Sequence, residues 1–73
     1  MDTKTLEEKL DSLGIKETAY SFDGTLKNSA LNMFQDNNKW EVFFCDEDGE
    51  RTIVDIFDTE AEACEAIYKI FWI

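Results

Sequence analysis

The sequence predicts an α+β domain with the order α-β-β-β-α, in which a three-stranded antiparallel meander packs against a C-terminal helix and a further helix lies at the N-terminus. Apolar residues recur at helical spacing near both ends of the chain. Between them, three runs alternate apolar and polar residues and are separated by turn residues. The 73 residues suffice for one domain, and no repeat or linker is visible, so residues 1–73 are assigned to a single unit.

The N-terminal helix is expected over about residues 3–13. Three leucines at i, i+4 and i+7 form one apolar stripe: Leu6, Leu10 and Leu13. Gly14 suits the left-handed position that ends many helices, and Ile15 then follows where it can contact Leu10. The helix therefore has a well-marked end.

Residues 16–29 carry weaker signals. Tyr20 and Phe22 alternate around a serine, which allows a short strand. Asp23 and Gly24 indicate a turn, and residues 25–29 are expected to be irregular.

Three strands are expected over residues 30–36, 39–46 and 50–57. Asn37 and Asn38 tolerate positive φ and therefore suit a two-residue hairpin turn between the first two strands.

The second hairpin is expected to turn through a three-residue loop, residues 47–49, with Gly49 in the left-handed position. A two-residue loop would place charged residues among core residues on both sheet faces. The chosen register predicts these cross-strand pairs: Phe44–Thr52, Val42–Val54, Trp40–Ile56, Met33–Val42 and Leu31–Phe44.

The last helix is expected from Thr59 or Glu60 to the final residue. Thr59 and Glu62 have the spacing of a capping box, in which the hydroxyl caps the helix and the carboxylate reaches back. Its apolar stripe should consist of Ala63, Cys64, Ile67, Ile70 and Phe71.

The chain is strongly acidic, with 17 Asp and Glu against 7 Lys and Arg and a net charge of -10. Such a field repels nucleic acid and anionic membranes and attracts basic surfaces. The first residues lack a basic start and an apolar stretch, and the apolar run at residues 70–73 is far too short to span a bilayer. We therefore expect a cytoplasmic protein that contacts neither nucleic acid nor membrane directly.

Nothing in the sequence suggests an enzyme, a metal site or a cofactor. The chain contains no histidine, its serines lack the Gly-x-Ser-x-Gly context, and its three glycines are isolated. Cys45 and Cys64 form no Cys-x-x-Cys motif and are expected to be free thiols. The acidic run at residues 46–50 does not have the glycine and glutamate spacing of a calcium loop.

The sheet face away from the C-terminal helix is the most suggestive feature for function. Aromatic residues interleaved with carboxylates suit an interface with an apolar centre and a charged edge. The alternative is that the N-terminal helix covers this face. The predicted register assigns to it Asn32, Phe34, Glu41, Phe43, Cys45, Ile53, Asp55 and Phe57.

Three segments resemble small bacterial immunity proteins of polymorphic toxin systems. They are Tyr-Ser-Phe-Asp-Gly at residues 20–24, Trp-Glu-Val-Phe-Phe at residues 40–44 and Phe-Asp-Thr-Glu-Ala-Glu-Ala-Cys at residues 57–64. The acidic hairpin at residues 46–50 departs from the basic, glycine-containing hairpin of that family. The resemblance implies neutralisation of a toxin made by the same cell.

We therefore expect a non-catalytic protein that binds a basic protein surface, such as that of a toxin or nuclease, as a monomer or weak homodimer. Two alternatives remain open: a phage- or plasmid-type acidic inhibitor that mimics nucleic acid towards a host nuclease, and a structural domain that self-associates. The residues expected to bind the partner are Glu41, Phe43, Asp46, Glu47, Asp48, Glu50 and Asp55.

Overall fold

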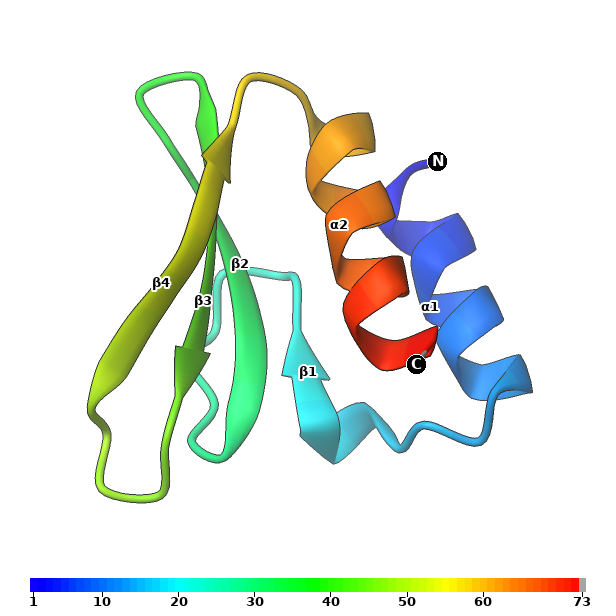
Figure 1. The fold of residues 1–73 in the computed structure, drawn as a ribbon, viewed down its shortest axis with the longest axis horizontal. Helices are drawn as coiled ribbons and strands as arrows, with labels where there is room; N and C mark the ends of the chain where they lie inside the picture. Colours follow the sequence, from blue (N-terminus) through cyan, green and yellow to red (C-terminus); the bar gives the residue numbers. More distant parts are fainter. Residues whose placement is uncertain (73) are drawn as a thin grey trace.

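The structure, a computed structural model, describes residues 1–72 and has a helix at each end and a sheet between them (Figure 1). The α+β class is confirmed. The expectation that the last helix reaches Ile73 concerns a residue outside the described residues. In chain order, the elements are α1 (Thr3–Ser12), the 3-10 helix η1 (Glu17–Ala19), β1 (Tyr20–Ser21), β2 (Ala30–Asp36), β3 (Lys39–Cys45), β4 (Arg51–Phe57) and α2 (Glu60–Trp72).

The sheet has four strands in the order β1-β2-β3-β4, and not the expected three. The added strand β1 runs parallel to β2, with Tyr20 beside Leu31 and Ser21 beside Asn32. The other two pairings are antiparallel, as predicted. A two-residue strand is too short to show a clear alternation in sequence, and its pairing depends on the chain returning through residues 22–29.

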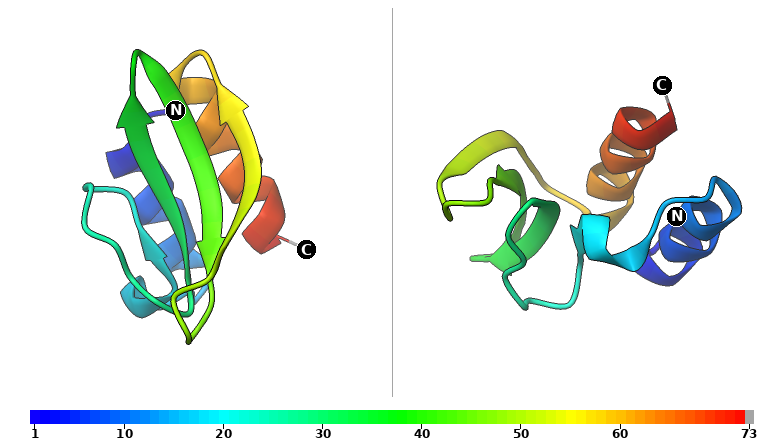
Figure 2. Two further views of the ribbon diagram at one scale, coloured as in Figure 1. Left: turned by 90° about the vertical axis from the view of Figure 1, so that its left-hand side faces the viewer. Right: turned by 90° about the horizontal axis from the view of Figure 1, so that it is seen from below.

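Both helices pack on the same face of the sheet, which we call the inner face (Figures 1 and 2). The alternative in which α1 covers the opposite, outer face is therefore wrong. Trp40 and Phe57 are half-buried at the margin of this core. The buried core residues come from both helices and three strands: Leu6, Leu10, Tyr20, Leu31, Met33, Val42, Ala63, Cys64 and Ile67.

Helix α1 ends as its sequence predicts. Gly14 has φ +81°, and its N–H donates to the Asp11 carbonyl at 2.9 Å, while Ile15 N–H donates to the Leu10 carbonyl at 3.0 Å. These two bonds form a Schellman motif. Leu13, which was expected in the apolar stripe, is the C-cap and is 42% exposed.

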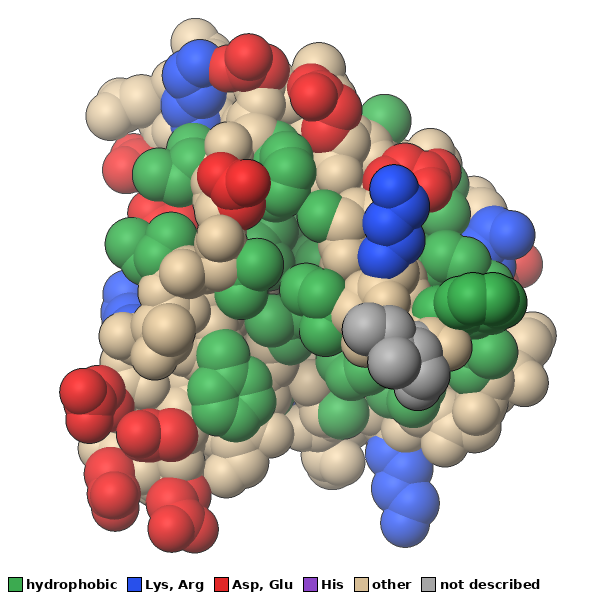
Figure 3. Space-filling view, viewed as in Figure 1, with side chains coloured by type: hydrophobic (Ala, Val, Ile, Leu, Met, Phe, Trp, Pro, Cys, Tyr) green, Lys and Arg blue, Asp and Glu red, His purple; other side chains and the backbone are tan. Residues whose placement is uncertain are grey.

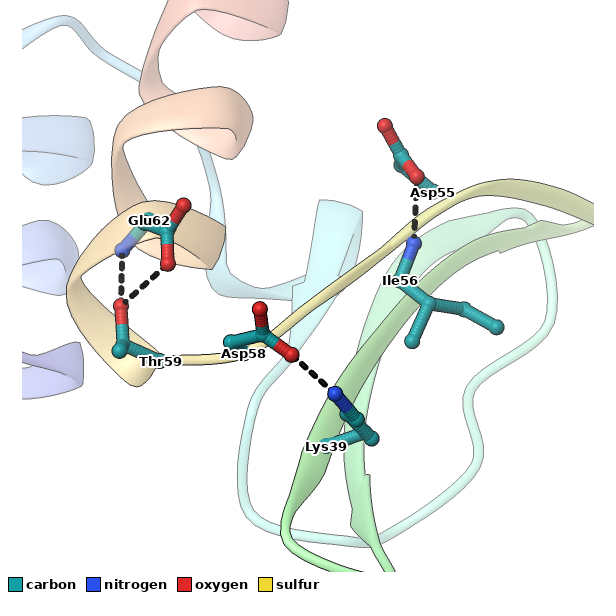
Figure 4. Close-up of polar contacts among 6 residues, drawn as sticks. All are labelled: Lys39, Asp55, Ile56, Asp58, Thr59 and Glu62. Atoms are coloured by element: carbon teal, nitrogen blue, oxygen red, sulfur yellow. Dashed lines mark hydrogen bonds and ion pairs between the residues drawn. The ribbon is translucent and has the colours of Figure 1, made fainter.

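Helix α2 begins with the predicted cap at Thr59 (Figure 4). Glu62 N–H donates to Thr59 Oγ1 at 3.2 Å, and the Thr59 hydroxyl donates to Glu62 Oε1 at 3.0 Å. The Glu62 carboxylate thus contacts the capping hydroxyl, whereas a standard capping box has it accept from the backbone N–H of the cap. The Thr3 N–H donates to Glu60 Oε2 at 3.0 Å and joins the first turns of the two helices.

The two hairpin turns are also as predicted. Asn37 and Asn38 have φ +50° and +64°. In the second turn Gly49 has φ +87°, and Asp46 N–H donates to the Glu50 carbonyl at 2.9 Å, which closes a three-residue loop. The Leu31–Phe44, Met33–Val42 and Phe44–Thr52 pairs follow.

A β-bulge at Val54 makes the rest of the predicted register wrong. Phe43 pairs with Ile53 but Val42 pairs with Asp55, so Val54 has no partner on β3. The bulge turns over every later residue of β4. Val42–Val54 and Trp40–Ile56 are therefore not pairs, and Trp40 lies opposite Phe57.

Truncating the core should destabilise the protein far more than truncating the helix end. Leu10 is 0% exposed, so Leu10→Ala is expected to lower the free energy of unfolding by about 2–5 kcal/mol. The matched variant Leu13→Ala removes the same atoms from a residue that is 42% exposed and should cost less than about 1 kcal/mol. Urea unfolding followed by circular dichroism measures both, and equal losses would contradict this packing.

Candidate interaction surface

The outer face of the sheet is closed at one end by the connection between β1 and β2 (Figure 2, left). Asn32, which is 0% exposed, accepts a hydrogen bond from Lys27 N–H and donates one to the Lys27 carbonyl, both at 3.0 Å. Cys45 Sγ donates to Asn28 Oδ1 at 3.4 Å. Residues 27–28 thus cover Asn32 and Cys45 on the outer face, and α1 does not.

Phe43, a predicted binding residue, is fully buried on this face. Its ring makes an edge-on contact with Phe34, with 5.2 Å between centroids, and the Arg51 guanidinium lies 5.0 Å from its centroid. Both contacts are of stabilising types. Phe43 therefore packs beneath the outer face and has no exposed area that a partner could contact.

Strand β4, at the edge of the sheet, carries the most exposed apolar side chains of the sheet. Ile53 is 57% exposed, Val54 45% and Ile56 51%, and Phe44 on β3 is 44% exposed. In Figure 3, hydrophobic side chains form a band between the β4 side and the α2 side of the molecule. Ile70, expected in the α2 core stripe, is 41% exposed, and Trp72 is 66% exposed. Ile53 and Ile56 lie on the outer face, whereas Phe44 lies on the inner face opposite Thr52. Neighbouring exposed apolar side chains such as those of β4 are typical of contact surfaces.

Acidic side chains gather at the end of the β3–β4 hairpin (Figure 3, lower left). Glu47, Asp48 and Glu50 are exposed. Asp46 differs, because its Oδ1 accepts hydrogen bonds from the backbone N–H groups of Asp48 and Glu50, both at 2.9 Å. We call these four residues the acidic tip: Asp46 shapes the loop and the other three present free carboxylates.

The other two predicted carboxylates lie on opposite sides of the sheet. Glu41 is half-buried on the outer face, opposite Ile56. Asp55 was expected beside it, but the bulge turns Asp55 to the inner face, where its Oδ1 accepts from Ile56 N–H at 2.7 Å (Figure 4). Phe57 moves to the inner face for the same reason.

The resulting surface combines apolar area with unpaired charge. We define the β4 edge surface as the acidic tip together with Ile53, Val54 and Ile56. Within residues 1–72 the one ion pair joins Lys39 and Asp58, so no cation of that part of the chain pairs with the tip (Figure 4). Sequence reasoning missed Val54 and Ile56, because no signal in the sequence marked the bulge that leaves Val54 unpaired and turns Ile56 to the outer face.

Reactive groups are scarce on this surface. Both thiols, Cys45 and Cys64, are fully buried, and burial raises the pKa of the Cys64 thiol to about 11. No three Asp, Glu or Cys side chains of residues 1–72 lie close enough together to hold a metal ion. Neither α1 nor α2, as far as residue 72, has the length and apolar character to cross a membrane.

The Cys64 thiol should make stability fall at high pH. Its pKa rises from 9.0 to about 11 on folding, so the neutral thiol stabilises the fold fully below pH 9. That contribution is lost as the pH rises through about 11. Urea unfolding at pH 8 and pH 10.5 should show a smaller loss in Cys64→Ala than in the parent protein, and equal losses would contradict a thiol that is buried and neutral.

Comparison of this chain with protein-family models, with curated proteins and with solved structures finds no match.

Proposed function

We propose that this protein is an immunity protein that neutralises a cognate bacterial toxin in the cytoplasm by binding it directly and masking a basic active site. The observation that carries the proposal is the β4 edge surface, in which three exposed, unpaired carboxylates stand next to an exposed apolar edge strand. The motifs at residues 20–24, 40–44 and 57–64, with their resemblance to immunity proteins, support it.

The two parts of the surface have different physical roles. The net charge of -10 and the acidic tip attract a basic partner over several ångströms and orient it during encounter. The side chains of Ile53, Val54 and Ile56 then lose water on contact and slow dissociation. An interface of this kind blocks an active site by coverage and needs no catalytic group.

The test of the function is protection. Cells that produce a toxin encoded beside the gene of this protein should survive when this protein is co-expressed and die without it. Death in both cases would contradict the proposal. If the pure protein instead competes with DNA for a host nuclease, the acidic tip acts as a nucleic-acid mimic, which is the alternative function.

Reversing the charge of the acidic tip should slow association. For Glu47→Lys/Asp48→Lys we expect an association rate constant about tenfold lower at low salt, because steering depends on charge, and a weaker dependence on ionic strength. Stopped-flow fluorescence with the purified toxin measures this rate.

The control for charge reversal is Asp36→Lys/Glu65→Lys, which makes the same change in net charge at exposed residues outside the β4 edge surface. Its rate should fall much less. If both double variants slow association equally, the tip has no specific part in the encounter.

Making the edge strand more polar should speed dissociation. Ile53→Thr keeps a β-branched residue in β4 but removes apolar area, and we expect a dissociation rate constant about fivefold higher, equivalent to roughly 1 kcal/mol. Leu26→Thr, a change at a residue that is 41% exposed outside this surface, should leave the rate unaltered. Surface plasmon resonance measures both rates.

Sedimentation velocity on the protein alone should show a monomer, since a concentration-dependent dimer would assign β4 to self-association.

A further inference from the structure

A second acidic region lies between α1, η1 and β1, on elements that the β4 edge surface does not use. Two adjoining hollows of about 140 Å³ and 410 Å³ share three lining residues, Glu7, Glu17 and Tyr20. We call the joined hollows the Tyr20 pocket. By the volume of liquid water, the smaller one alone has room for roughly five water molecules, which is enough for a small organic cation.

Tyr20 forms the floor of this pocket. It is only 8% exposed, and its ring stacks on that of Phe22 with 4.8 Å between centroids. Within residues 1–72 every buried polar side-chain atom has a hydrogen-bond partner, whereas the Tyr20 hydroxyl has none. The hydroxyl oxygen is therefore accessible, and Tyr20 lines both hollows. A phenol held in this way has a free donor and a free acceptor for a ligand.

Carboxylates from two elements line the pocket together with the phenol: Glu7 on α1 and Glu17 on η1 line both hollows. Burial raises the pKa of Tyr20, and the charges of Glu7 and Glu17 raise it further. The Lys27 Nζ donates to the Glu17 backbone carbonyl at 3.0 Å and not to its carboxylate. No ion pair within residues 1–72 involves these carboxylates.

The lining as a whole is negative. In the smaller hollow Glu7, Glu17 and Asp23 face one cation, Lys27. In the larger hollow four carboxylates face two cations, Lys4 and Lys16; the four are Glu7, Glu8, Asp11 and Glu17. A cation is therefore the expected ligand.

We propose that the Tyr20 pocket binds a guanidinium group. Glu7 and Glu17 come from different elements, α1 and η1, and no three carboxylates of residues 1–72 converge as metal ligands do. A planar guanidinium has five N–H donors in a fixed fork, so it can reach Glu7, Glu17 and the Tyr20 hydroxyl at once, whereas a compact ammonium is a single point charge.

The guanidinium has two chemical sources, an arginine side chain of a protein or a free arginine-like molecule. The inference goes beyond the proposed function, because the pocket and the β4 edge surface share no residue. Its test needs no toxin, so a failure here leaves the proposed function standing and the reverse also holds.

The experiment is an NMR titration of the ¹⁵N-labelled protein with methylguanidinium chloride. The backbone signals of Glu7, Glu17 and Tyr20 should shift together with one dissociation constant. Tyr20→Phe, which removes only the hydroxyl, should weaken binding about threefold to tenfold. Glu7→Gln/Glu17→Gln should weaken it at least tenfold.

The control variant is Glu62→Gln/Glu65→Gln, which removes the same two charges from α2. Binding should weaken by less than about twofold, because distant exposed charges are screened. If this variant matches the pocket variant, or if Tyr20→Phe binds as the parent does, the proposal is overturned. Methylammonium or Mg²⁺ binding as tightly as methylguanidinium would overturn it as well.

Further titrations separate the two sources. An arginine-containing peptide that binds much more tightly than free arginine identifies a protein side chain as the ligand, provided that the lysine version of the peptide binds weakly. Free arginine binding as tightly as the peptide identifies a small molecule. If neither binds, the pocket is not a guanidinium site.

Discussion

One buried layer of side chains holds both helices against a single face of the sheet, and the rest of the structure follows from it. Leu6 and Leu10 of α1 and Ile67 of α2 meet Met33 and Val42 there, and each is 1% exposed or less. In a chain of 73 residues the apolar side chains suffice for one such layer. With both helices on the inner face, the outer face depends on other means of closure.

The contacts that close the outer face of the sheet are local and polar. The paired hydrogen bonds between Asn32 and Lys27 fasten the β1–β2 connection over one end of the outer face and satisfy a fully buried amide. Arg51 and Phe34 cover the ring of Phe43. On β4, Ile53 beside Phe43 and Ile56 beside Glu41 stay accessible.

The bulge at Val54 explains why the exposed apolar edge strand β4 does not readily pair with a strand of another chain. A bulge interrupts the regular ladder that another strand needs for pairing, and the Asp55 carboxylate already occupies the N–H of Ile56. The net charge of -10 opposes contact between copies of this chain. These features disfavour indiscriminate strand pairing while leaving side chains available to a basic partner.

Much of the fold could be predicted from the sequence, because its signals are local. Gly14 and Thr59 marked a helix end and a helix start, while Asn37, Asn38 and Gly49 marked the hairpin turns by the backbone conformations that they tolerate. The acidic tip was also predicted, since four of five consecutive residues are acidic.

The tertiary structure alone decided which helices and strands are neighbours. The parallel pairing of β1, the position of α1 on the inner face and the bulge at Val54 depend on contacts between distant residues, for which a local pattern carries no signal. As a result Asp55 moved away from the predicted binding face and Phe43 was buried. The sequence by itself determined the elements, the turns and the charge, because these follow from short-range sterics and composition. Packing decided which side chains reach the surface, because burial depends on the whole chain.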